Sequence, residues 1–276
     1  MLVDLHTHSN CSDGTLTPAE LVSCAAAAGV NLLALTDHDT VAGLHEAQAA
    51  ADECAITLVP GVEISAAWRA QAIHVLGLWI DPAAPALQTH LAAQADLRRE
   101  RMRKICARLG KLGLPGEKLL NIVQAFPGVP TRAHLAHALV AVGAVDSPDA
   151  AFRKYLGKGK PAHIAAEWPA LEEVVGWITA CGGVAALAHP ARYSLSSGAR
   201  SKLVGDFAAA GGAALEVVSG ANGHQHVDVC AALAMAGGLK GSVGSDFHDP
   251  QHSWNPLGRS LKLPEGITPI WRSYGL

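Results

Sequence analysis

The sequence predicts an α/β fold: a closed barrel of about seven strands, surrounded by helices and interrupted by an inserted helical subdomain. Short apolar segments alternate with amphipathic segments along most of the chain, which is the pattern of repeated β–α units. Polar residues follow most of the apolar segments, as they do at the mouth of such a barrel. The alternation stops between about residues 82 and 167, where helical segments follow one another.

An open, doubly wound sheet is the main alternative architecture, and the residues disfavour it. Such a sheet gathers its site at one switch point and usually carries a glycine-rich phosphate loop after its first strand. No such loop follows the first apolar segment, and polar residues follow several strands instead of one. The parallel, closed barrel is therefore the preferred prediction.

Composition indicates a globular chain that needs local positive charge to bind an anion. Half of the 276 residues are hydrophobic, and the formal net charge is −3. The six cysteines are scattered without a Cys-x-x-Cys pair, which favours reduced thiols over disulfides or a thiolate zinc site. No secretory leader or membrane-spanning apolar run is recognisable, so we expect a cytoplasmic protein with no membrane partner and no DNA-binding domain.

The chain opens with an apolar segment, residues 2–5, that predicts the first strand, and two histidines follow it at once. Side chains alternate between the two faces of an extended segment, so His6 and His8 point the same way. Two imidazoles side by side indicate a metal site, whereas the simpler alternative is a surface strand end with two solvated histidines. The other strand ends decide between these interpretations.

The next segment carries the signals of a helix. Thr17 is a capping hydroxyl, Pro18 suits the first helical position, Glu20 completes a capping box, and Gly29 ends the helix. A further helix, capped by Asp39 or Thr40, is expected to run to about Cys54. The other apolar segments predict strands at residues 31–35, 57–59 with 62–64, 73–78, 184–188, 213–218 and 241–243.

Residues 83–166 predict an inserted helical cap subdomain, which leaves residues 1–82 and 167–276 for the barrel. The first helix of the insertion carries seven of the 21 lysines and arginines between residues 98 and 111. The same helix also carries a stripe of apolar residues at helical spacing: Leu97, Met102, Ile105, Leu109 and Leu112. A charge run of this kind is usually a solvated helix face, and the functional alternative is a positive wall beside the barrel mouth.

Nine residues at or near the predicted strand ends combine imidazole and carboxylate groups: His6, His8, Asp13, His38, Glu63, His74, His189, Asp246 and His248. Nitrogen and oxygen ligands without thiolate suit manganese, iron or zinc in a site that keeps positions open for water and substrate. So many ligands imply more than one metal ion.

The ordered motifs resemble those of the PHP (polymerase and histidinol phosphatase) family of metal-dependent phosphoesterases. Asp-Leu-His-Thr-His-Ser opens the series, and Asp13, Thr-Asp-His-Asp, Glu63, His74, Ala-His-Pro and Gly-Ser-Asp-Phe-His follow, so the resemblance spans residues 4–248. Each motif alone is weak, but the ordered set is specific, and no motif position is substituted. The resemblance implies a distorted (β/α)7 TIM-like barrel, the PHP fold, that binds two or three metal ions.

The resemblance also implies a role for each ligand. His6, His8, Glu63 and Asp246 would hold one ion, Glu63 would bridge to a second ion held by His74 and His189, and Asp13, His38 and His248 would hold the third. Mn²⁺ is the expected cofactor, with Fe²⁺ or Zn²⁺ as alternatives. A metal-bridging water, held by Glu63, Asp246 and His189, would attack phosphorus, so no protein nucleophile is required.

The expected charge of this site favours a phosphate ester. Three divalent ions with the carboxylates of Asp13, Glu63 and Asp246 leave a net charge of about +3, which a hydroxide and a phosphomonoester dianion would neutralise. The predicted substrate-binding side chains are Arg132, His134, Lys160 and Arg192, with His163 as a further candidate. Three aromatic residues would either stack on a nucleobase or pack in the interior: Trp68, Tyr193 and Trp254.

Within the family, a compact chain with an insertion that contains Pro-Thr-Arg-Ala-His resembles the nucleoside 3′,5′-bisphosphate phosphatases and the related 5′-to-3′ exoribonucleases. This implies a small nucleotide substrate that loses its 3′-phosphate to leave a 5′-mononucleotide, or else a short 5′-phosphorylated RNA. Histidinol phosphatase is a further alternative. An amidohydrolase-type C–N hydrolase is disfavoured because residues 1–103 contain no lysine to bridge two metals. A metal-stabilised binding module is disfavoured because none of the nine expected ligands is missing.

Overall fold

The computed structural model describes residues 1–220, 223–251, 255–259 and 261–276. Its strands form one seven-stranded sheet in sequence order: β1 (Val3–Asp4), β2 (Leu32–Leu35), β3 (Thr57–Trp68), β4 (Gln71–Leu78), β5 (Val184–Leu187), β6 (Ala214–Ser219) and β7 (Lys240–Gly244). Beyond β1, the Leu5 amide donates to the Val243 carbonyl of β7 at 2.9 Å, and Thr7 bridges Phe247. The ends of the sheet thus meet, and the predicted barrel is confirmed.

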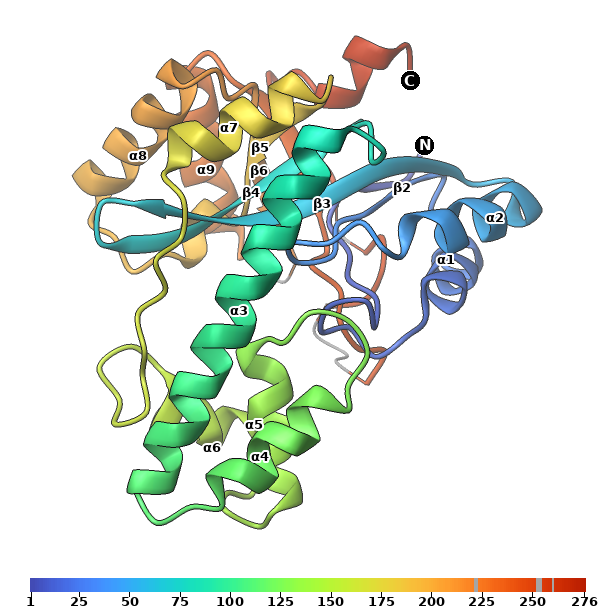
Figure 1. The fold of residues 1–276 in the computed structure, drawn as a ribbon. Coiled ribbons are helices and arrows are strands. Elements are labelled where there is room, and N and C mark those ends of the chain that lie inside the picture. The colour runs from blue at the N-terminus through green and yellow to red at the C-terminus, as the bar shows by residue number, and fades with distance from the viewer. Residues whose placement is uncertain (221–222, 252–254, 260) are drawn as a thin grey trace.

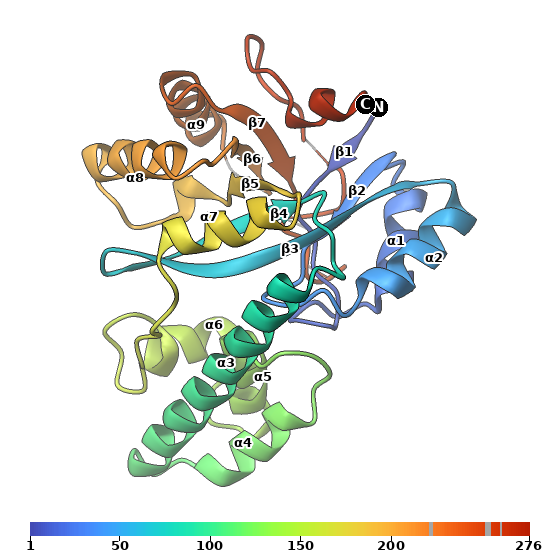
Figure 2. The same ribbon diagram turned by 45° about the horizontal axis from the view of Figure 1, so that its top comes forward.

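Helices lie outside this barrel. They are α1 (Pro18–Ala27), α2 (Leu44–Cys54), α3 (Pro85–Lys111), α4 (Gly116–Gln124), α5 (Arg132–Ala141), α6 (Pro148–Ala151), α7 (Leu171–Ala180), α8 (Ser197–Ala209) and α9 (His224–Ala236), with short turns η1 (Phe152–Leu156), η2 (Pro190–Arg192) and η3 (Ile270–Tyr274). Helices α1 and α2 cover one side of the barrel, and α7, α8 and α9 cover the other (Figures 1 and 2). In the described part of the chain, no helix has both the length and the apolar character to cross a membrane.

The first helix forms where its capping signals predict it. The Thr17 hydroxyl accepts from the Glu20 amide at 3.2 Å, and the Glu20 carboxylate accepts from the Thr17 amide at 2.8 Å. This reciprocal pair satisfies two amides that the helix itself leaves free. Gly29 follows the helix with a φ of 80°, a conformation that favours glycine. The predicted boundaries of α1 are therefore confirmed.

The prediction that the strands are parallel is wrong for β4. Strands β3 and β4 form an antiparallel hairpin joined by residues 69–70, and β4 is also antiparallel to β5. So short a connection can only reverse the chain, because a parallel crossover needs about a dozen residues or more. His74 consequently lies near the start of β4, opposite Ser65 of β3, and not at the carboxyl end of a strand.

Other boundaries also differ from the predicted ones. Strand β1 contains only Val3 and Asp4, and β3 is one continuous strand where two short ones were expected. Helix α2 begins at Leu44, several residues after the predicted cap. The reason is that Asp39 has a left-handed backbone, with a φ of 50°, and its carboxylate accepts from the Ser65 amide at 2.7 Å. The carboxylate is thus used within the barrel and does not cap a helix.

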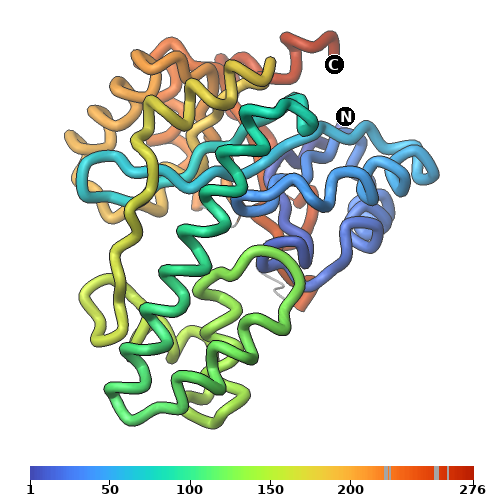
Figure 3. Tube along the Cα trace, in the orientation of Figure 1, coloured from blue at the N-terminus to red at the C-terminus, as the bar shows by residue number. Residues whose placement is uncertain are grey.

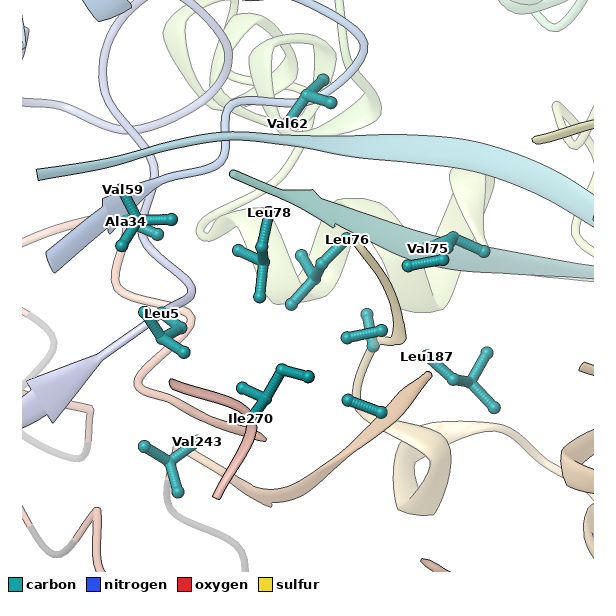
Figure 4. Close-up of a cluster of buried hydrophobic side chains, with 14 of the residues drawn as sticks. Leu5, Ala34, Val59, Val62, Val75, Leu76, Leu78, Leu187, Val243 and Ile270 are labelled. Carbon is teal, nitrogen blue, oxygen red and sulfur yellow. The ribbon is translucent and has the colours of Figure 1, made fainter. Parts of the chain in front are cut away.

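The main hydrophobic core fills the barrel and the space between the sheet and its helices. Figure 4 shows side chains from successive strands, among them Ala34, Val62, Leu76 and Val243, gathered in one buried cluster. A second, smaller core lies in the insertion, where Met102, Ile105 and Leu109 of α3 pack with residues of α4 and α5. Each core is a separate cluster of buried side chains contributed by its own set of elements.

The chain leaves the barrel along α3 and returns through an extended segment before α7 (Figure 3). The first turns of α3 still belong to the barrel core through Leu87 and Leu91, whereas its later turns belong to the second core. We propose that residues 83–166 form the cap subdomain, and that residues 1–82 with 167–276 form the barrel. Helix α3 connects the two without a break.

The basic segment of α3 divides into two faces. Arg99 and Arg103 are exposed and pair with Asp96 and Glu100, three residues earlier on the helix, which is the solvated arrangement typical of such charge runs. Arg98 and Arg101 lie on another face, where Arg98 donates to Asp39 and Arg101 donates to the Ile164 carbonyl. The apolar stripe is also narrower than predicted, because 38% of Leu97 and 46% of Leu112 are exposed.

Candidate metal centre

The nine predicted ligands converge at the mouth of the barrel. They come from β3 and β4 and from the segments that directly follow β1, β2, β5 and β7. The antiparallel direction of β4 brings its beginning, with His74, to the edge where the parallel strands end. Six ring–ring centroid distances of 4.1–5.6 Å link His6, His8, His38, His74, His189 and His248 into one group.

Glu63 occupies the centre of this cluster and is fully buried. Its Oε1 lies 2.9 Å from both His74 Nδ1 and His189 Nε2. Its Oε2 lies 2.9 Å from His38 Nδ1, and 3.3 Å from the Nε2 atom of each histidine of the opening motif. One carboxylate therefore faces five imidazoles.

Two further carboxylates lie on either side of Glu63. Asp246 Oδ1 is 3.1 Å from His8 Nε2 and 3.3 Å from His6 Nε2. Asp13 Oδ1 is 3.3 Å from His248 Nε2. Carboxylate and imidazole groups thus alternate across the cluster, which is the donor set that hard and borderline divalent cations prefer.

The opening histidines share a face because the backbone stays extended after β1. Thr7, between them, points the other way, and its hydroxyl donates to the Ala34 carbonyl at 2.7 Å. The following loop is fastened by Asp37, which accepts from the amide and hydroxyl of Ser9 at 2.8 and 2.6 Å and from the hydroxyl of Ser12 at 2.6 Å. This anchoring brings Asp13, the next residue, to the cluster.

Three residues at the strand ends have left-handed backbones: Asp39, His189 and Asp246, with φ values of 50°, 31° and 55°. Such conformations are costly for residues with a side chain and persist where the surrounding structure holds them. His189 and Asp246 directly follow the ends of strands and aim their side chains into the cluster. Among the described residues, these three make up half of the six non-glycine residues with a positive φ.

The charges in the cluster depend on one another. Burial alone would raise the pKa of Glu63, but His38 and His74 outweigh it and hold the pKa well below its usual range. Burial lowers the pKa of His8 to about 3, so this imidazole is neutral and can offer a lone pair. Burial opposes the protonation of His248, yet Asp13 and Asp246 raise its pKa to about 9. The carboxylates thus attract positive charge into the site.

Several buried atoms of the cluster have no hydrogen-bond partner among the described residues: His6 Nε2, His8 Nε2, Asp13 Oδ1, His38 Nδ1, Glu63 Oε2 and His189 Nδ1. Leaving a buried polar atom unpaired costs about 1–3 kcal/mol, so six in one place indicate a missing ligand. Two ligands bound to the same ion at about 2.1 Å lie roughly 3 Å apart, close to the separations seen here. The residues therefore fit divalent metal ions.

The ligand atoms form three overlapping groups, each with all its atoms within 4.8 Å of one another: His6, His8, Glu63 and Asp246; His8, Asp13, His38 and His248; and His38, Glu63 and His74. The first group contains the residues expected for one ion. The other two groups contain His8 and His38 beyond the residues expected for each ion. None of the three groups includes His189, whose Nε2 lies 2.9 Å from Glu63 Oε1. The assignment of residues to individual ions stays a prediction.

A cleft of about 430 Å³ opens from the cluster towards the cap. Its barrel wall carries Asp13, His38, His74 and His189 together with Arg192. Its cap wall carries a group of basic side chains: Arg98, Arg101, Arg132, Lys158 and His163. The insertion thus forms one wall of the cleft, and the basic wall considered in the sequence analysis is made by part of α3.

Arg98 is held in this wall by hydrogen bonds to side chains, whereas among the described residues Arg101 and Arg132 bond only to backbone carbonyls. Arg98 donates to Asp39 Oδ2 at 2.6 Å and to Ser65 Oγ at 2.9 Å. Arg101 donates through Nε to a backbone carbonyl at 3.0 Å, and Arg132 makes a 3.5 Å contact to another carbonyl. Their guanidinium carbons lie 5.8 Å from the centre of the Trp168 ring and 5.7 Å from that of Phe152, respectively. Among the described residues neither Arg101 nor Arg132 pairs with a carboxylate. The cleft therefore holds positive charge without a partner.

Two of the predicted substrate-binding residues do not line the cleft. His134 is buried in the cap, where Nδ1 accepts from the Thr131 amide at 3.2 Å and its ring stacks on Phe126. His134 lies three residues after Thr131, the N-cap residue of α5, and is the reciprocal partner of Thr131 in a capping box, which the sequence interpretation overlooked. Lys160 is exposed and does not line the cleft, whereas Lys158 of the same loop does.

The aromatic candidates are mostly structural. The Trp68 indole donates to Asp206 at 2.9 Å, away from the cluster. The Tyr193 hydroxyl lines the cleft but is already used, because it donates to the Ala188 carbonyl and accepts from the His74 amide. Trp254 lies outside the described residues. Trp168, which the sequence analysis did not select, lines the cleft instead.

Sequence reasoning also missed Glu216, a fully buried carboxylate inside β6. It bonds to His6 Nδ1 at 2.9 Å, so the site contains one more carboxyl group than was counted. The signal was present, because a lone glutamate in the apolar strand Ala-Leu-Glu-Val-Val-Ser is costly unless it has a buried partner. Arg192, which pairs with Asp246, restores one positive charge.

Comparison with known proteins agrees with this geometry. The model of the PHP domain family matches residues 4–123. The 5′-3′ exoribonuclease of Haemophilus influenzae is 42% identical over 275 residues, which cover 98% of each chain. The 3′,5′-nucleoside bisphosphate phosphatase of Chromobacterium violaceum is 43% identical over 272 residues, covering 98% of this chain and 95% of the relative.

Solved structures show the same fold. A protein of Chromobacterium violaceum named an amidohydrolase, with bound sulfate and no metal, has a TM-score of 0.93 and 41% identity, covering 100% of this chain and 96% of its own. A protein of Bifidobacterium adolescentis, described as a metal-dependent phosphoesterase, has a TM-score of 0.81 and 28% identity over 99% of this chain and 94% of its own. The whole chain, barrel and insertion together, therefore has close structural relatives.

Proposed function

This chain belongs to the PHP family of metal-dependent phosphoesterases, and from that premise we propose that it removes the 3′-phosphate of nucleoside 3′,5′-bisphosphates. The product would be a 5′-mononucleotide. One observation carries the choice of a substrate with two phosphates. The cleft has two separate regions that suit a phosphate: the ligand cluster, which would be positive once divalent ions are bound, and the cap arginines that pair with no carboxylate among the described residues.

The cap arginines support a site for the phosphate that is not hydrolysed. Burial lowers the pKa of Arg101 to about 10, and the charges of Arg132 and Arg98 act in the same direction. Cations that repel one another in a partly buried wall are stabilised when an anion enters between them. Guanidinium groups suit phosphate because their planar N–H donors can bind two oxygens at once.

The phosphate to be hydrolysed would lie over the cluster. Bound divalent ions would activate a water molecule for attack and stabilise the negative charge that develops on the phosphoryl oxygens. Arg192, whose guanidinium is anchored on Asp246, would donate its remaining N–H groups to the same phosphoryl group. Mn²⁺ is our proposed ion, since imidazole and carboxylate donors suit it, and Fe²⁺ or Zn²⁺ would suit the same donors.

The test is a comparison of kcat/KM for adenosine 3′,5′-bisphosphate, adenosine 3′-monophosphate and histidinol phosphate with Mn²⁺ present. A charge-assisted bond to the second phosphate contributes about 1.5–3 kcal/mol, so the bisphosphate should be used roughly tenfold to a hundredfold better than the monophosphate. Equal use of the two nucleotides, or a preference for histidinol phosphate, would contradict the proposal.

Replacing Arg101 or Arg132 with alanine should remove most of that preference. Each variant is expected to lower kcat/KM for the bisphosphate by about tenfold to a hundredfold and to leave kcat/KM for the monophosphate nearly unchanged. Arg99→Ala is a matched control, because Arg99 is exposed, pairs with Asp96 and lines a different groove. Equal losses of kcat/KM on both nucleotides would indicate that these arginines have a structural role instead.

A second candidate function has comparable support. The relative named as an exoribonuclease and the relative named as a bisphosphate phosphatase are almost equally similar to this chain. A short RNA with a 5′-phosphate would place that phosphate against the same arginines and the next phosphodiester over the cluster. Release of mononucleotides from 5′-phosphorylated but not from 5′-hydroxyl RNA would support this activity.

The geometry disfavours two other readings of the site. An amidohydrolase-type hydrolase often bridges its two metals with a lysine, but Glu63 occupies the centre of the cluster and the first lysine of the chain is Lys104. A purely structural metal-binding module would need no basic cleft beside its ligands. Hydrolysis of p-nitrophenyl phosphate with added Mn²⁺ would exclude both, whereas inactivity of folded protein with every divalent metal would favour the module.

A further inference from the structure

Glu216 is a buried carboxylate that belongs to none of the predicted ligand sets. It lies in the middle of β6 and has no exposed surface. The pairing of β6 with β7 shifts at this point, because Glu216 pairs with Ser242 whereas Val218 pairs with Val243, so β6 carries one extra residue. A bulge of this kind re-aims the neighbouring side chains. Here it accompanies a carboxylate that points towards the cluster.

Both oxygens of Glu216 are used. Oε1 accepts from His6 Nδ1 at 2.9 Å, and Oε2 accepts from the backbone amide of His189 at 2.6 Å. When Nδ1 of a neutral histidine donates to a carboxylate, the proton is held there and Nε2 keeps its lone pair for a metal ion. His6 Nε2 is the atom that faces Glu63 and Asp246 without a hydrogen-bond partner.

The second bond holds the strained segment after β5. His189 has a φ of 31°, and from this backbone position its ring reaches Glu63 Oε1 at 2.9 Å. The carboxylate that accepts from its amide compensates part of the cost of the conformation. One side chain thus orients two histidines that stand on different strand ends.

The surroundings leave Glu216 little freedom. A Cβ added at Gly244 would lie 2.6 Å from Glu216 Oε1 and 2.2 Å from His6 Cβ. Glycine at this position allows β7 to approach the pair closely. The position of the carboxylate is therefore set by packing as well as by its hydrogen bonds.

We propose that Glu216 is a positioning residue that raises the metal affinity of the centre by orienting His6 and His189 together. It would touch neither the ions nor the substrate. Partners that orient metal-binding histidines typically change metal affinity by about 10–100-fold. The inference concerns the ions alone, so it holds or fails independently of which phosphate ester the enzyme uses.

The experiment measures Mn²⁺ affinity of metal-depleted full-length protein by competition with a chelator. Glu216→Gln keeps the size of the side chain but offers one acceptor where two are needed, and it should weaken binding by about 10–100-fold. Glu216→Ala loses both bonds and should weaken it further. Ser242→Ala is the matched control, since Ser242 pairs with Glu216 across the strands and its buried hydroxyl has no partner among the described residues.

A spectroscopic measurement separates orientation from general damage. In the metal-free wild type, the His6 Nδ1 proton should be protected from exchange and visible by ¹⁵N-histidine NMR, and it should be lost in Glu216→Ala. Thermal melting establishes that each variant is folded. Folded Glu216→Gln with wild-type Mn²⁺ affinity would overturn the proposal, and so would an equal loss of affinity in Ser242→Ala. If Glu216→Ala does not fold, the glutamine variant decides.

Discussion

Replacement of Glu63 by glutamine is expected to lower kcat/KM by about 10³-fold or more, a loss of about 4 kcal/mol in transition-state stabilisation. The reason is the central position of this carboxylate, which faces five imidazoles and takes part in two of the three ligand groups. Glutamine has nearly the same shape, but its neutral amide cannot bridge two cations. The variant should therefore lose metal as well as activity.

The measurement combines steady-state kinetics at several Mn²⁺ concentrations with metal analysis of the same preparation. Glu172→Gln is a suitable control, because this exposed carboxylate lies in the first turn of α7. Its substitution should leave both activity and metal content unchanged. A Glu63→Gln variant that keeps wild-type metal content and stays within about tenfold of wild-type activity would show that the bridging role is wrong.

Removal of metal from the wild-type protein should reduce activity by about 10²-fold or more, and added Mn²⁺ should restore it. Active protein should contain about two to three ions per chain, as the three ligand groups indicate. The metal-free protein should stay folded, because the two hydrophobic cores do not include the ligands. It should nevertheless melt at a lower temperature, since the unpaired buried groups then lose their ligand.

Chelation followed by metal analysis, activity assay and thermal melting tests this expectation. Mn²⁺ at about 100 times its dissociation constant should stabilise the fold by about 2.7 kcal/mol for each site, and so raise the melting temperature by roughly 5 °C or more. Mg²⁺ at the same concentration is an informative comparison, because it binds histidine poorly. Full activity with less than one ion per chain would contradict the metal-dependent mechanism.

Local patterns predicted much of this molecule because they depend on neighbouring residues alone. The alternation of side chains along a strand placed His6 and His8 on one face, and both Nε2 atoms do approach Asp246 within 3.1–3.3 Å. The capping box of α1 formed because its two hydrogen bonds lie within four residues. The order of strands followed from the repeated alternation of apolar and amphipathic segments.

The direction of β4 and the start of α2 depended on contacts that no local pattern contains. The tight hairpin at residues 69–70 reversed β4, and it brought His74 to the cluster from the opposite direction. Asp39 resembles a helix cap in the sequence, yet its carboxylate accepts hydrogen bonds from Ser65 and Arg98, which are distant along the chain. These hydrogen bonds form only where the strands and α3 pack together in the tertiary structure.

The sequence by itself determined which chemical groups this protein brings to its strand ends, because imidazole and carboxylate side chains there are too costly to be accidental. Only the tertiary structure decided which of them meet. It separated Arg101, which faces the cleft, from Arg99 and Arg103 on the same helix, and it buried His134 in the cap subdomain. The physical reason is that a side chain's role depends on its burial and partners, and both arise from segments far apart in the chain.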